Sequence, residues 1–385
     1  MQVCNNCVMD TTDPEINFNS DGVCSYCTTF PEYKRRYVPP DVASGKALER
    51  LCREIKQANV NGNEYDCLIG LSGGADSSYM AYLVKKMGLK PLAVHFDSGW
   101  NSELAVQNIE KIVKSLDLDL VTHVCDWEEM SDLQLSFFKA SLVNCDIPQD
   151  HAFVSVLYET AAKFGLKYVL SGHNFATESV LPRKWGYTSD DLLHLKAVHK
   201  RFGRKKLKKY PMQGFITRFF YYPFVKKIKI IRFLNYTEYH KEQAMDLLTQ
   251  ELGWRKYAAK HYESIFTRFN QGYYLAEKFH FDKRKAHLSS LILNGYITRD
   301  QAIKELAKPL YNPKDLEEDL EFVAKKLKIT PQGFAAIIAQ PPRAHEELPS
   351  HARLFTLGVK VKRLFYRLLK GQGAKPGVEI EASTS

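Results

Sequence analysis

The feature that most constrains the fold is the stretch YDCLIGLSGGADSSYMAYLVKKMG at residues 65–88. A short apolar run leads into Ser72, Gly73 and Gly74, and a helical pattern begins near Ser77. The two glycines let the backbone turn tightly and direct successive N–H groups toward one point. A helix that starts there adds the positive end of its dipole. This unit therefore predicts a binding loop for phosphate.

The residues around this loop alternate between strand and helix patterns. Helices are predicted at 77–87 and 103–116, and two more flank the segment NCDIPQDH. Strands are predicted at 67–71, 91–97, 118–124 and 167–173, with a fifth near 227–233. Apolar strands separated by helices indicate a parallel, doubly wound α/β sheet of the Rossmann-like type. Ligands of such sheets bind beyond the carboxyl ends of the strands, so the residues after each strand are candidates for a site.

The loop lacks the lysine of an ordinary P-loop, although it has the glycines of one. That lysine serves the transfer of a γ-phosphoryl group, so γ-transfer is disfavoured here. A loop that holds the β- and γ-phosphates as a leaving unit suits attack at the α-phosphorus instead. Asp76 lies at the start of the helix, where its carboxylate either caps the helix or helps to hold a divalent cation beside the phosphates.

The hexapeptide SGGADS resembles the ATP pyrophosphatase, or PP-loop, signature of enzymes that activate a carbonyl oxygen as an adenylate. HFDSGW and GHNFATES, at the ends of the second and fourth strands, are similar to two further loops of that superfamily. The resemblance implies a sheet of the PP-loop (HUP) type that binds ATP with Mg²⁺. Without it, Asp97 is equally well a helix cap and His173 an ordinary loop histidine. The residues implied in nucleotide binding are Ser72, Gly73, Gly74, Asp76, Ser77, Ser78, Asp97, Gly172, His173 and Asn174.

Two Cys-x-x-Cys pairs lie near the N-terminus, in CNNC and CSYC, with sixteen residues between them. This spacing predicts a tetrahedral thiolate site for structural zinc, with Cys4, Cys7, Cys24 and Cys27 as ligands. So short a segment cannot bury a core, so metal binding would supply its folding energy, on the order of 10–16 kcal/mol. An iron–sulfur centre and four unrelated thiols are the alternatives.

The chain has 385 residues, room for roughly two or three compact units, and a basic balance of +10. It shows no N-terminal signal segment and no run of about 18 apolar residues, so we expect a soluble cytoplasmic protein. The other four cysteines are scattered in apolar or helical context, which is typical of inert core thiols. None lies in the strand–elbow context of a glutaminase nucleophile. They are Cys52, Cys67, Cys125 and Cys145.

A four-cysteine head before a PP-loop is found in two families. One comprises the N-acetyl sugar amidotransferases of bacterial surface-polysaccharide (O-antigen, lipopolysaccharide) synthesis, and the other the tRNA-thiolating enzymes. Longer segments of this chain, at 147–179, 197–203 and 234–302, closely resemble the sugar amidotransferases. The resemblance covers roughly residues 1–310, while the tail beyond about Pro342 matches no pattern.

This resemblance implies an ATP-dependent amidotransferase that acts on an N-acetyl sugar, as a nucleotide-linked diacetamido uronic acid. The acetamido oxygen would attack the α-phosphorus and release pyrophosphate, and ammonia would then displace AMP to leave an acetamidino group. Adenylation is needed because an amide carbonyl is a poor electrophile and oxide a poor leaving group. The protein mainly positions the reactants and neutralises charge. The implied partners are a separate glutaminase and an ammonia-channelling subunit, which resemble the two subunits of imidazole glycerol phosphate synthase.

Polar residues near predicted strand ends, and others in the segment KHYESIFTRF, are candidates for contact with the sugar or with ammonia. One of them is expected to be a general base. A polar network between domains is an equally weighted alternative for any single residue. Together with Asp76, the catalytic candidates are Asp150, His151, Glu178, His261, Glu263 and Arg268.

Residues 192–237 contain thirteen Lys and Arg and no Asp or Glu. Such a segment suits RNA, the diphosphate of a sugar nucleotide or an acidic partner, but a solvated face is the commonest reason for a charge run. The stretch 354–370 is basic and amphipathic. Such helices pack on their own domain or on a partner more often than on an anionic membrane. We therefore favour neither nucleic acid nor a peripheral membrane contact.

We expect four units: a zinc-binding knuckle and linker at 1–38, a PP-loop domain at 39–255, a helical substrate or partner region at 256–345, and a basic tail at 346–385. The preferred function is the sugar amidotransferase. The alternatives are a tRNA-thiolating enzyme and a non-catalytic subunit that keeps the ATP fold and recruits a glutaminase.

Overall fold

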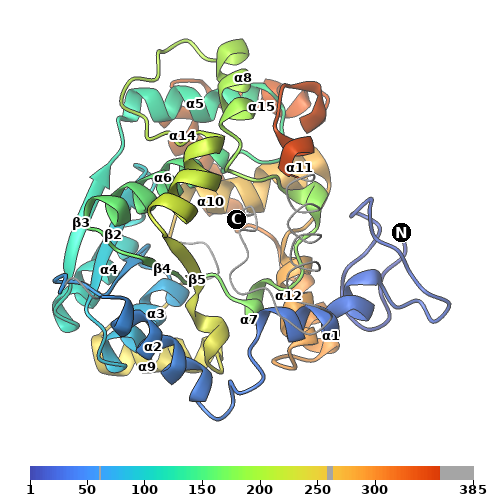
Figure 1. Ribbon diagram of the computed structural model, residues 1–385. Coiled ribbons are helices and arrows are strands. Elements are labelled where there is room, and N and C mark those ends of the chain that lie inside the picture. The colour runs from blue at the N-terminus through green and yellow to red at the C-terminus, as the bar shows by residue number, and fades with distance from the viewer. Residues whose placement is uncertain (60–61, 258–262, 356–385) are drawn as a thin grey trace.

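The computed structural model describes residues 1–59, 62–257 and 263–355 (Figure 1). At its centre lies a five-stranded sheet in the order β3-β2-β1-β4-β5, in which every pair is parallel. The strands are β1 (Cys67–Gly70), β2 (Pro91–Asp97), β3 (Asp119–Val124), β4 (Tyr168–Ser171) and β5 (Lys229–Arg232). The predicted parallel, doubly wound sheet is confirmed.

Both faces of the sheet are covered, which explains why its strands are continuous apolar runs. Successive side chains of a strand point to opposite faces. Leu68 therefore joins one core and Ile69 the other. Helix α6 (Ile147–Lys163) covers the first face. The second face is covered by α2 (Lys46–Ala58), α3 (Ala75–Lys86), α4 (Glu103–Ser115) and α9 (Lys241–Leu252).

Further helices lie beyond the carboxyl ends of the strands, at the top of Figure 1. An aromatic cluster joins three of them to one another: the ring of Phe138 on α5 lies 5.6 Å from that of Phe266 on α10 and 5.1 Å from that of Phe334 on α15. Because this layer covers the edge where ligands bind in such sheets, it is placed to complete a site. Its members are α5 (Trp127–Lys139), α8 (Leu192–Phe202), α10 (Ile265–Phe269), α11 (Leu275–Phe279), α14 (Pro313–Lys326) and α15 (Pro331–Ala339).

The N-terminal knuckle packs on helices that lie far away in the sequence. The guanidinium of Arg299 donates to the carbonyl oxygens of Cys7 and Cys4, at 3.0 and 3.1 Å, and the N–H of Val8 donates to Ser289 Oγ at 3.3 Å. Figure 1 shows α1 beside α12, on the right. The helices concerned are α1 (Ser25–Tyr37), α12 (Arg284–Leu293) and α13 (Arg299–Leu306).

Shorter elements complete the described chain, and no helix in it is long and apolar enough to cross a bilayer. They are the helix α7 (Phe175–Glu178), the 3₁₀ turns η1 (Arg183–Trp185), η3 (Phe233–Tyr236) and η5 (His345–Glu347), and the π-helical segments η2 (Thr217–Val225) and η4 (Asn270–Tyr274).

Two predicted helix boundaries need correction. Helix α3 begins at Ala75 rather than near Ser77, because Gly74 serves as its N-cap. Asp76 and Ser77 therefore lie in its first turn. Helices α5 and α6 lie on the two sides of the segment NCDIPQDH, as predicted, but α6 begins inside it, at Ile147, with a proline in its first turn, a position where the missing N–H costs nothing. Only the start of the predicted amphipathic stretch 354–370 lies within the described residues.

Candidate functional site

The loop between β1 and α3 turns at Gly73. This residue has a φ of +80°, and a Cβ at this position would lie 2.6 Å from the carbonyl oxygen of Ala105. Both facts select glycine, because other residues avoid this φ and no side chain fits the gap. The loop leads directly into the N-terminus of α3, a helix of 12 residues. The arrangement is suited to an anion, as the sequence predicts.

Serine hydroxyls close the loop from inside. Ser77 Oγ accepts from the N–H of Ser72 at 3.2 Å, lies 3.0 Å from Ser72 Oγ, and donates to the carbonyl oxygen of Gly74 at 3.2 Å. The buried Ser78 Oγ has no hydrogen-bond partner among the described residues. A buried hydroxyl without a partner is costly. The chemistry of this set, glycine turn, helix N-terminus and hydroxyls, fits the phosphates of ATP.

Three aromatic side chains from the region of α9 hold the loop in place. Gly73 O accepts from Trp254 Nε1 at 3.0 Å and from the Tyr257 hydroxyl at 2.9 Å. The hydroxyl of Tyr239 donates to Asp76 Oδ1. Burial, and then the Asp76 carboxylate, raise the pKa of Tyr239 well above its usual value, so it stays a donor at neutral pH. No pattern in the sequence identifies these three residues as neighbours of the loop.

The loop after β2 is tied to the strand before the phosphate loop. His95 Nδ1 lies 2.9 Å from the carbonyl oxygen of Leu71, and Asn101 Nδ2 donates to the other ring nitrogen at 3.1 Å. These partners assign the ring hydrogen to Nδ1. Asp97 Oδ1 accepts from the N–H of Gly99 at 2.8 Å and from Asn101 Nδ2 at 3.1 Å. Asp97 therefore holds its own loop at the sheet edge, while the cap of α4 is Ser102.

The loop after β4 lies against the start of α3. A Cβ at Gly172 would lie 3.1 Å from the backbone nitrogen of Ser77, so the two loops touch through their backbones. Asn174 caps the short helix α7, because its Oδ1 accepts from the N–H of Thr177 at 2.9 Å. The predicted loops after β1 and β4 are thus neighbours in space.

An ion pair between His173 and Glu178 lies at the same edge of the sheet. His173 Nδ1 lies 2.8 Å from Glu178 Oε2, and the pKa of His173 is raised by the charge of Glu178. Asp150, in the first turn of α6, raises this pKa further, whereas Arg232 lowers it. Three residues proposed from the sequence, Asp150, His173 and Glu178, therefore act on one another.

The C-terminal helical region reaches the loop through Glu263. The carbonyl oxygen of Glu263 accepts from the N–H of Ser102 at 3.0 Å, and Ser264 forms an antiparallel bridge with Asn101. A Cβ at Gly74 would lie 3.5 Å from Glu263 Oε1. The carboxylate of Glu263 therefore lies over the phosphate loop, although the two residues are far apart in the sequence.

Two other candidates lie in polar networks away from the loop. His151 is fully buried, its Nδ1 is 2.6 Å from the carbonyl oxygen of Ser189, and its Nε2 accepts from the N–H of Gln213 at 3.2 Å. Burial lowers the pKa of His151, so the ring is neutral and both nitrogens are engaged. Arg268 donates to both carboxylate oxygens of Asp319 on α14, at 2.7 and 2.6 Å. These contacts fit the alternative of a structural network. His261 lies outside the described residues.

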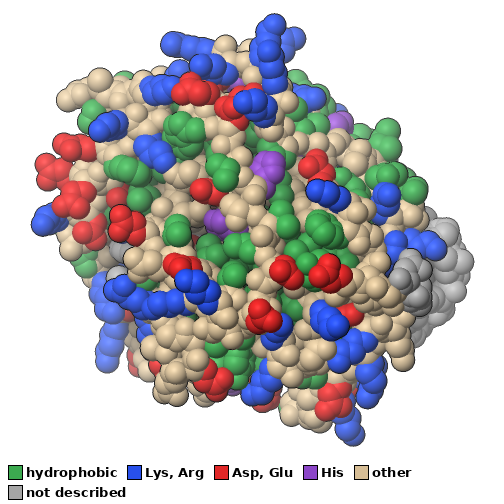
Figure 2. Space-filling model, turned by 90° about the vertical axis from the view of Figure 1, so that its left-hand side faces the viewer, with side chains coloured by type: hydrophobic (Ala, Val, Ile, Leu, Met, Phe, Trp, Pro, Cys, Tyr) green, Lys and Arg blue, Asp and Glu red, His purple; other side chains and the backbone are tan. Residues whose placement is uncertain are grey.

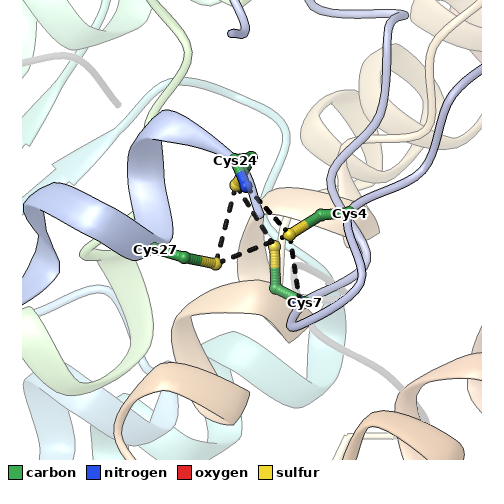
Figure 3. Close-up of side chains that lie close together, drawn as sticks. All are labelled: Cys4, Cys7, Cys24 and Cys27. Carbon is green, nitrogen blue, oxygen red and sulfur yellow. Dashed lines mark hydrogen bonds between the residues drawn. The ribbon is translucent and has the colours of Figure 1, made fainter. Parts of the chain in front are cut away.

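The four N-terminal cysteines form one cluster, with their thiols pointing toward one another (Figure 3). The Sγ–Sγ distances are 3.7 Å for Cys4–Cys27, 3.7 Å for Cys7–Cys24 and 3.6 Å for Cys24–Cys27. Ligands about 2.3 Å from a zinc ion in a tetrahedron lie about 3.8 Å apart, so the cluster has the dimensions of a zinc site. The predicted knuckle is confirmed as a structure.

The other four cysteines are buried, as predicted for core thiols. Burial raises the pKa of Cys52 to about 11 and that of Cys125 to about 12. It raises the pKa values of Cys67 and Cys145 well above the usual range. Because the thiolate is the nucleophilic form, none of these thiols is activated.

Some lysines of the basic segment 192–237 form ion pairs with α5, and others line an open groove. Lys205 and Lys209 pair with Glu128 and Asp126 at the start of α5, both at 3.0 Å. Figure 2 shows Lys and Arg side chains along the upper edge of one face, at the height where Figure 1 places α8. An open groove of about 470 Å³ is lined there by Lys196, His199, Lys200, Lys205, Lys206, Leu207, Lys208 and Met212.

Comparisons with known proteins agree with the two halves of this site. Residues 47–212 match the NAD synthase family, and residues 263–362 match the family described as LPS biosynthesis protein WbpG-like, C-terminal domain. One part of the chain is thus similar to NAD synthases and a later part to the C-terminal domain of WbpG-like proteins. The resemblance to PP-loop proteins of polysaccharide synthesis is confirmed. Glu263, which lies over the loop, is the first residue of the WbpG-like match.

Individual relatives match only parts of the chain. It is 31% identical over 138 residues to tRNA(Ile)-lysidine synthase of Chlamydia pneumoniae, which covers 35% of this chain and 40% of that protein. NMN synthetase from Francisella tularensis has 19% identity and a TM-score of 0.29, over 56% of this chain and 98% of that one. NH3-dependent NAD synthetase from Campylobacter jejuni has 15% identity and a TM-score of 0.30, over 78% and 98%. At such low TM-scores, neither structure supports a conclusion about this chain.

Proposed function

We propose that this chain is an ATP-dependent amidotransferase that converts the acetamido group of an N-acetyl sugar into an acetamidino group. The substrate class is a nucleotide-linked diacetamido uronic acid. The observation that carries the proposal is the position of Glu263 over Gly74, because it brings the start of the WbpG-like domain to the phosphate loop. A domain similar to one of lipopolysaccharide biosynthesis would then help to build the reaction centre.

The proposed reaction has two displacements. The acetamido oxygen of the sugar attacks the α-phosphorus of ATP, and pyrophosphate leaves. Ammonia then adds to the former amide carbon, and AMP leaves with the former acetamido oxygen. The chain's own part is to position the reactants and to stabilise charge at the site where it develops.

In this proposal, the phosphate loop binds the pyrophosphate that leaves. Ser72, Gly74 and Ser77, with the N-terminus of α3, are suited to the β- and γ-phosphates. Asp76, oriented by Tyr239, is the proposed ligand for Mg²⁺, which would neutralise phosphate charge when bound. Asp97 and the loop at Gly172 and Asn174 complete the proposed nucleotide contacts.

Two groups at the loop are suited to different tasks. Ammonia that has attacked the adenylate must lose a proton, and Glu263 is the proposed base because its carboxylate faces the loop. The raised pKa of His173 keeps its ring charged closer to neutral pH. A charged imidazole favours contact with phosphate over proton abstraction, so we place His173 and Glu178 on the phosphate side.

Ammonia is proposed to come from a separate glutaminase, through a channelling subunit. The raised pKa values of the buried cysteines support this, because they leave no activated thiol among them. Zinc is the proposed metal of the cysteine cluster. Contacts of the knuckle with α12 and α13 support a structural role for this metal.

The ATP half alone does not choose between functions. The chain's similarity to tRNA(Ile)-lysidine synthase is equally compatible with an RNA substrate, as in the tRNA-thiolating alternative. The WbpG-like half supports the sugar hypothesis, since the family it matches is described as one of LPS biosynthesis and its first residue reaches the loop.

The test is incubation of the purified chain with ATP, ammonium and a UDP-linked diacetamido uronic acid. We expect AMP, pyrophosphate and a sugar product lighter by the difference between O and NH. Glu263→Gln should lower product formation by roughly 10²-fold or more, the range for loss of a general base, while ATP still binds. The matched control is Glu110→Gln, an exposed residue whose carboxylate pairs with Lys114.

Two results would overturn the proposed function, and a third would overturn the role of Glu263 in it. Sulfur transfer to tRNA without a sugar product would support the thiolating alternative. ATP consumption that is unchanged in Asp76→Ala, together with capture of a glutaminase, would support a non-catalytic subunit. Equal activity of Glu263→Gln and Glu110→Gln would remove Glu263 from the mechanism.

A further inference from the structure

A ridge of exposed apolar side chains runs along the π-helical segment η2. The exposed fractions are 73% for Ile216, 54% for Phe220, 40% for Tyr221, 70% for Phe224 and 66% for Val225. Steps of four and five residues place these side chains on one side of a helix of this kind. Single exposed apolar residues are ordinary, but five together on one segment form a surface that needs an occupant. We call these five residues the η2 ridge.

The opposite side of η2 is anchored to the core. Arg218 is buried, donates to Asp190 Oδ1 at 2.9 Å and to the Tyr158 hydroxyl at 2.6 Å, and stacks on the Tyr158 ring. The ring of Tyr222 stacks on that of Tyr158 at 4.7 Å. Because these contacts fix one side of η2 against α6, the ridge is turned outward by the fold.

Cations border the ridge. Lys226 and Lys227 follow it directly, whereas the next lysine, Lys229, pairs with Glu54 at 3.2 Å, and the whole segment 192–237 contains no acidic residue. The ammonium of Lys226 lies 5.7 Å from the centre of the Tyr221 ring. Burial, and then the charge of Glu159 on α6, raise the pKa of Tyr222, so an acidic side chain also lies near η2. Apolar side chains bordered by lysines are typical of surfaces that rest on an anionic bilayer.

Charge also argues against the chain's own tail as the occupant. Phe355, the last residue described, packs against Phe215 and Phe219 at 5.5 and 5.3 Å, beside the ridge. The following residues, 356–370, carry five Lys and Arg and no acidic residue. Cations of this segment would meet Lys226 and Lys227 at the ridge, and two copies of the ridge would bring the same lysines together, so like charges disfavour both occupants. A negatively charged occupant complements both.

We propose that the η2 ridge is a contact site for an anionic phospholipid surface. The protruding side chains would enter the boundary between headgroups and acyl chains, and the lysines would lie at the phosphates. Protruding side chains suit a bilayer, which deforms around them, whereas a protein partner must offer matching pockets. The proposal goes beyond the proposed function. It also differs from the sequence analysis, which did not favour a peripheral membrane contact.

Flotation of the full chain with vesicles tests the proposal. We expect binding to vesicles of equal parts phosphatidylglycerol and phosphatidylethanolamine, weakened by salt, and none to phosphatidylcholine alone. The double variant Phe220→Ser, Phe224→Ser should partition roughly tenfold or more weakly, because two apolar side chains no longer insert. Lys226→Glu with Lys227→Glu should have a similar effect. The matched control is Val106→Ser with Val124→Ser, whose exposed fractions are 53% and 67%.

Measurements of melting temperature and oligomeric state distinguish a lipid surface from the two other occupants, which are the chain's own tail and a second copy of the chain. If the proposal holds, the Phe220 and Phe224 variant melts like the wild type and has the same mass in solution, while vesicle binding falls. A variant that melts earlier and binds vesicles unchanged would show that the tail covers the ridge. A variant that dissociates a dimer and binds vesicles unchanged would show a second copy there. Either result, or no binding by the wild type, overturns the proposal, and none depends on amidotransferase activity.

Discussion

The phosphate loop and the cysteine knuckle are both visible as motifs in the sequence, yet the fold builds them differently. The knuckle takes all four of its thiols from one short segment of the chain, and these thiols lie 3.6–3.7 Å apart. The loop depends on distant residues: Trp254 and Tyr257, which bond to Gly73, lie 181 and 184 residues away. A motif can therefore carry its chemistry locally while its geometry is set by the tertiary structure.

The two motifs also differ in what they are coupled to. The knuckle bonds to the C-terminal helices through Arg299, and the loop bonds to the region of α9 and to Glu263. Substitutions in the two motifs should consequently have different effects. Substitutions in the knuckle should disturb the packing of α12 and α13, whereas substitutions in the loop should weaken nucleotide binding.

Metal removal should have the largest effect. Binding of structural zinc is worth on the order of 10–16 kcal/mol, so Cys24→Ser or a strong chelator should unfold the knuckle. Elemental analysis should show loss of zinc, and hydrogen exchange should rise in residues 1–37 and in α12 and α13. ATP binding at the loop should persist. Cys125→Ser, a buried cysteine outside the cluster, is the control that keeps the metal.

Two results would contradict the prediction for metal removal. If Cys24→Ser retained full metal, the cluster would not be its site. If the loss of metal abolished ATP binding to the same degree, the two motifs would be coupled after all, and the comparison would fail.

Gly73→Ala should have the next largest effect. The new Cβ would meet the backbone oxygen of Ala105 at 2.6 Å, and the φ of +80° is itself unfavourable for alanine. The matched control is Gly45→Ala, which has a φ of +74° but nothing within 4 Å of the new Cβ. We expect Gly73→Ala to destabilise the chain by about 1–3 kcal/mol more than the control, in denaturant unfolding, and to abolish ATP binding. Equal losses would mean that only φ matters at this turn.

Much of the fold follows from the sequence because it is dictated by local patterns. The strand β2 lies at the predicted residues, since a buried parallel strand is a continuous apolar run. The start of α3 was missed by two residues because a glycine N-cap leaves no side-chain signal. The turn, the knuckle and the sheet edge that holds the site are all local features of this kind.

The partners within the site could not be predicted in the same way. Asp150, His151 and Glu178 are all polar residues near predicted strand ends, yet burial and two backbone partners remove His151 from the set. Arg268 was grouped with Glu263 by nearness in sequence, but its carboxylate partner Asp319 lies on another helix. Tyr239 and Trp254 reach the loop only through tertiary packing. Such pairs depend on contacts that no spacing encodes.

The donors to Gly73 give a third, smaller test of the loop's dependence on distant residues. Trp254→Phe or Tyr257→Phe alone should cost about 0.5–1.5 kcal/mol, because the other donor remains. The double variant leaves the carbonyl without either partner and should cost more than the sum of the two. Calorimetric titration with ATP and thermal unfolding are the measurements. Tyr65→Phe, which removes a hydroxyl bonded to Asp119 at the surface, is the control.

Additive losses in that cycle would contradict a shared acceptor. They would mean that each aromatic side chain acts through packing, and that the loop is held more by shape than by hydrogen bonds. An effect on unfolding without any effect on ATP affinity would lead to the same conclusion.

The smallest effect concerns the charge pair at the sheet edge. Glu178 raises the pKa of His173 above its usual value of 6.5, so the protonated ring is favoured in the folded state. The stability that this pair adds is fully present below about pH 6.5, as long as the glutamate stays ionised, and is lost as the pH rises through the folded pKa. His173→Gln should therefore lower the melting temperature at pH 6 and leave it unchanged well above that pKa.

His123 provides a control of opposite sign. Burial lowers the pKa of His123, so its neutral ring is favoured and its contribution is lost as the pH falls. The difference between wild type and His123→Gln should thus shrink toward acid pH, where the difference for His173→Gln grows. If both variants followed the same pH trend, Glu178 would not be the cause of the shift at His173. The phosphate side of the site would then lack the positive charge that its proposed role requires.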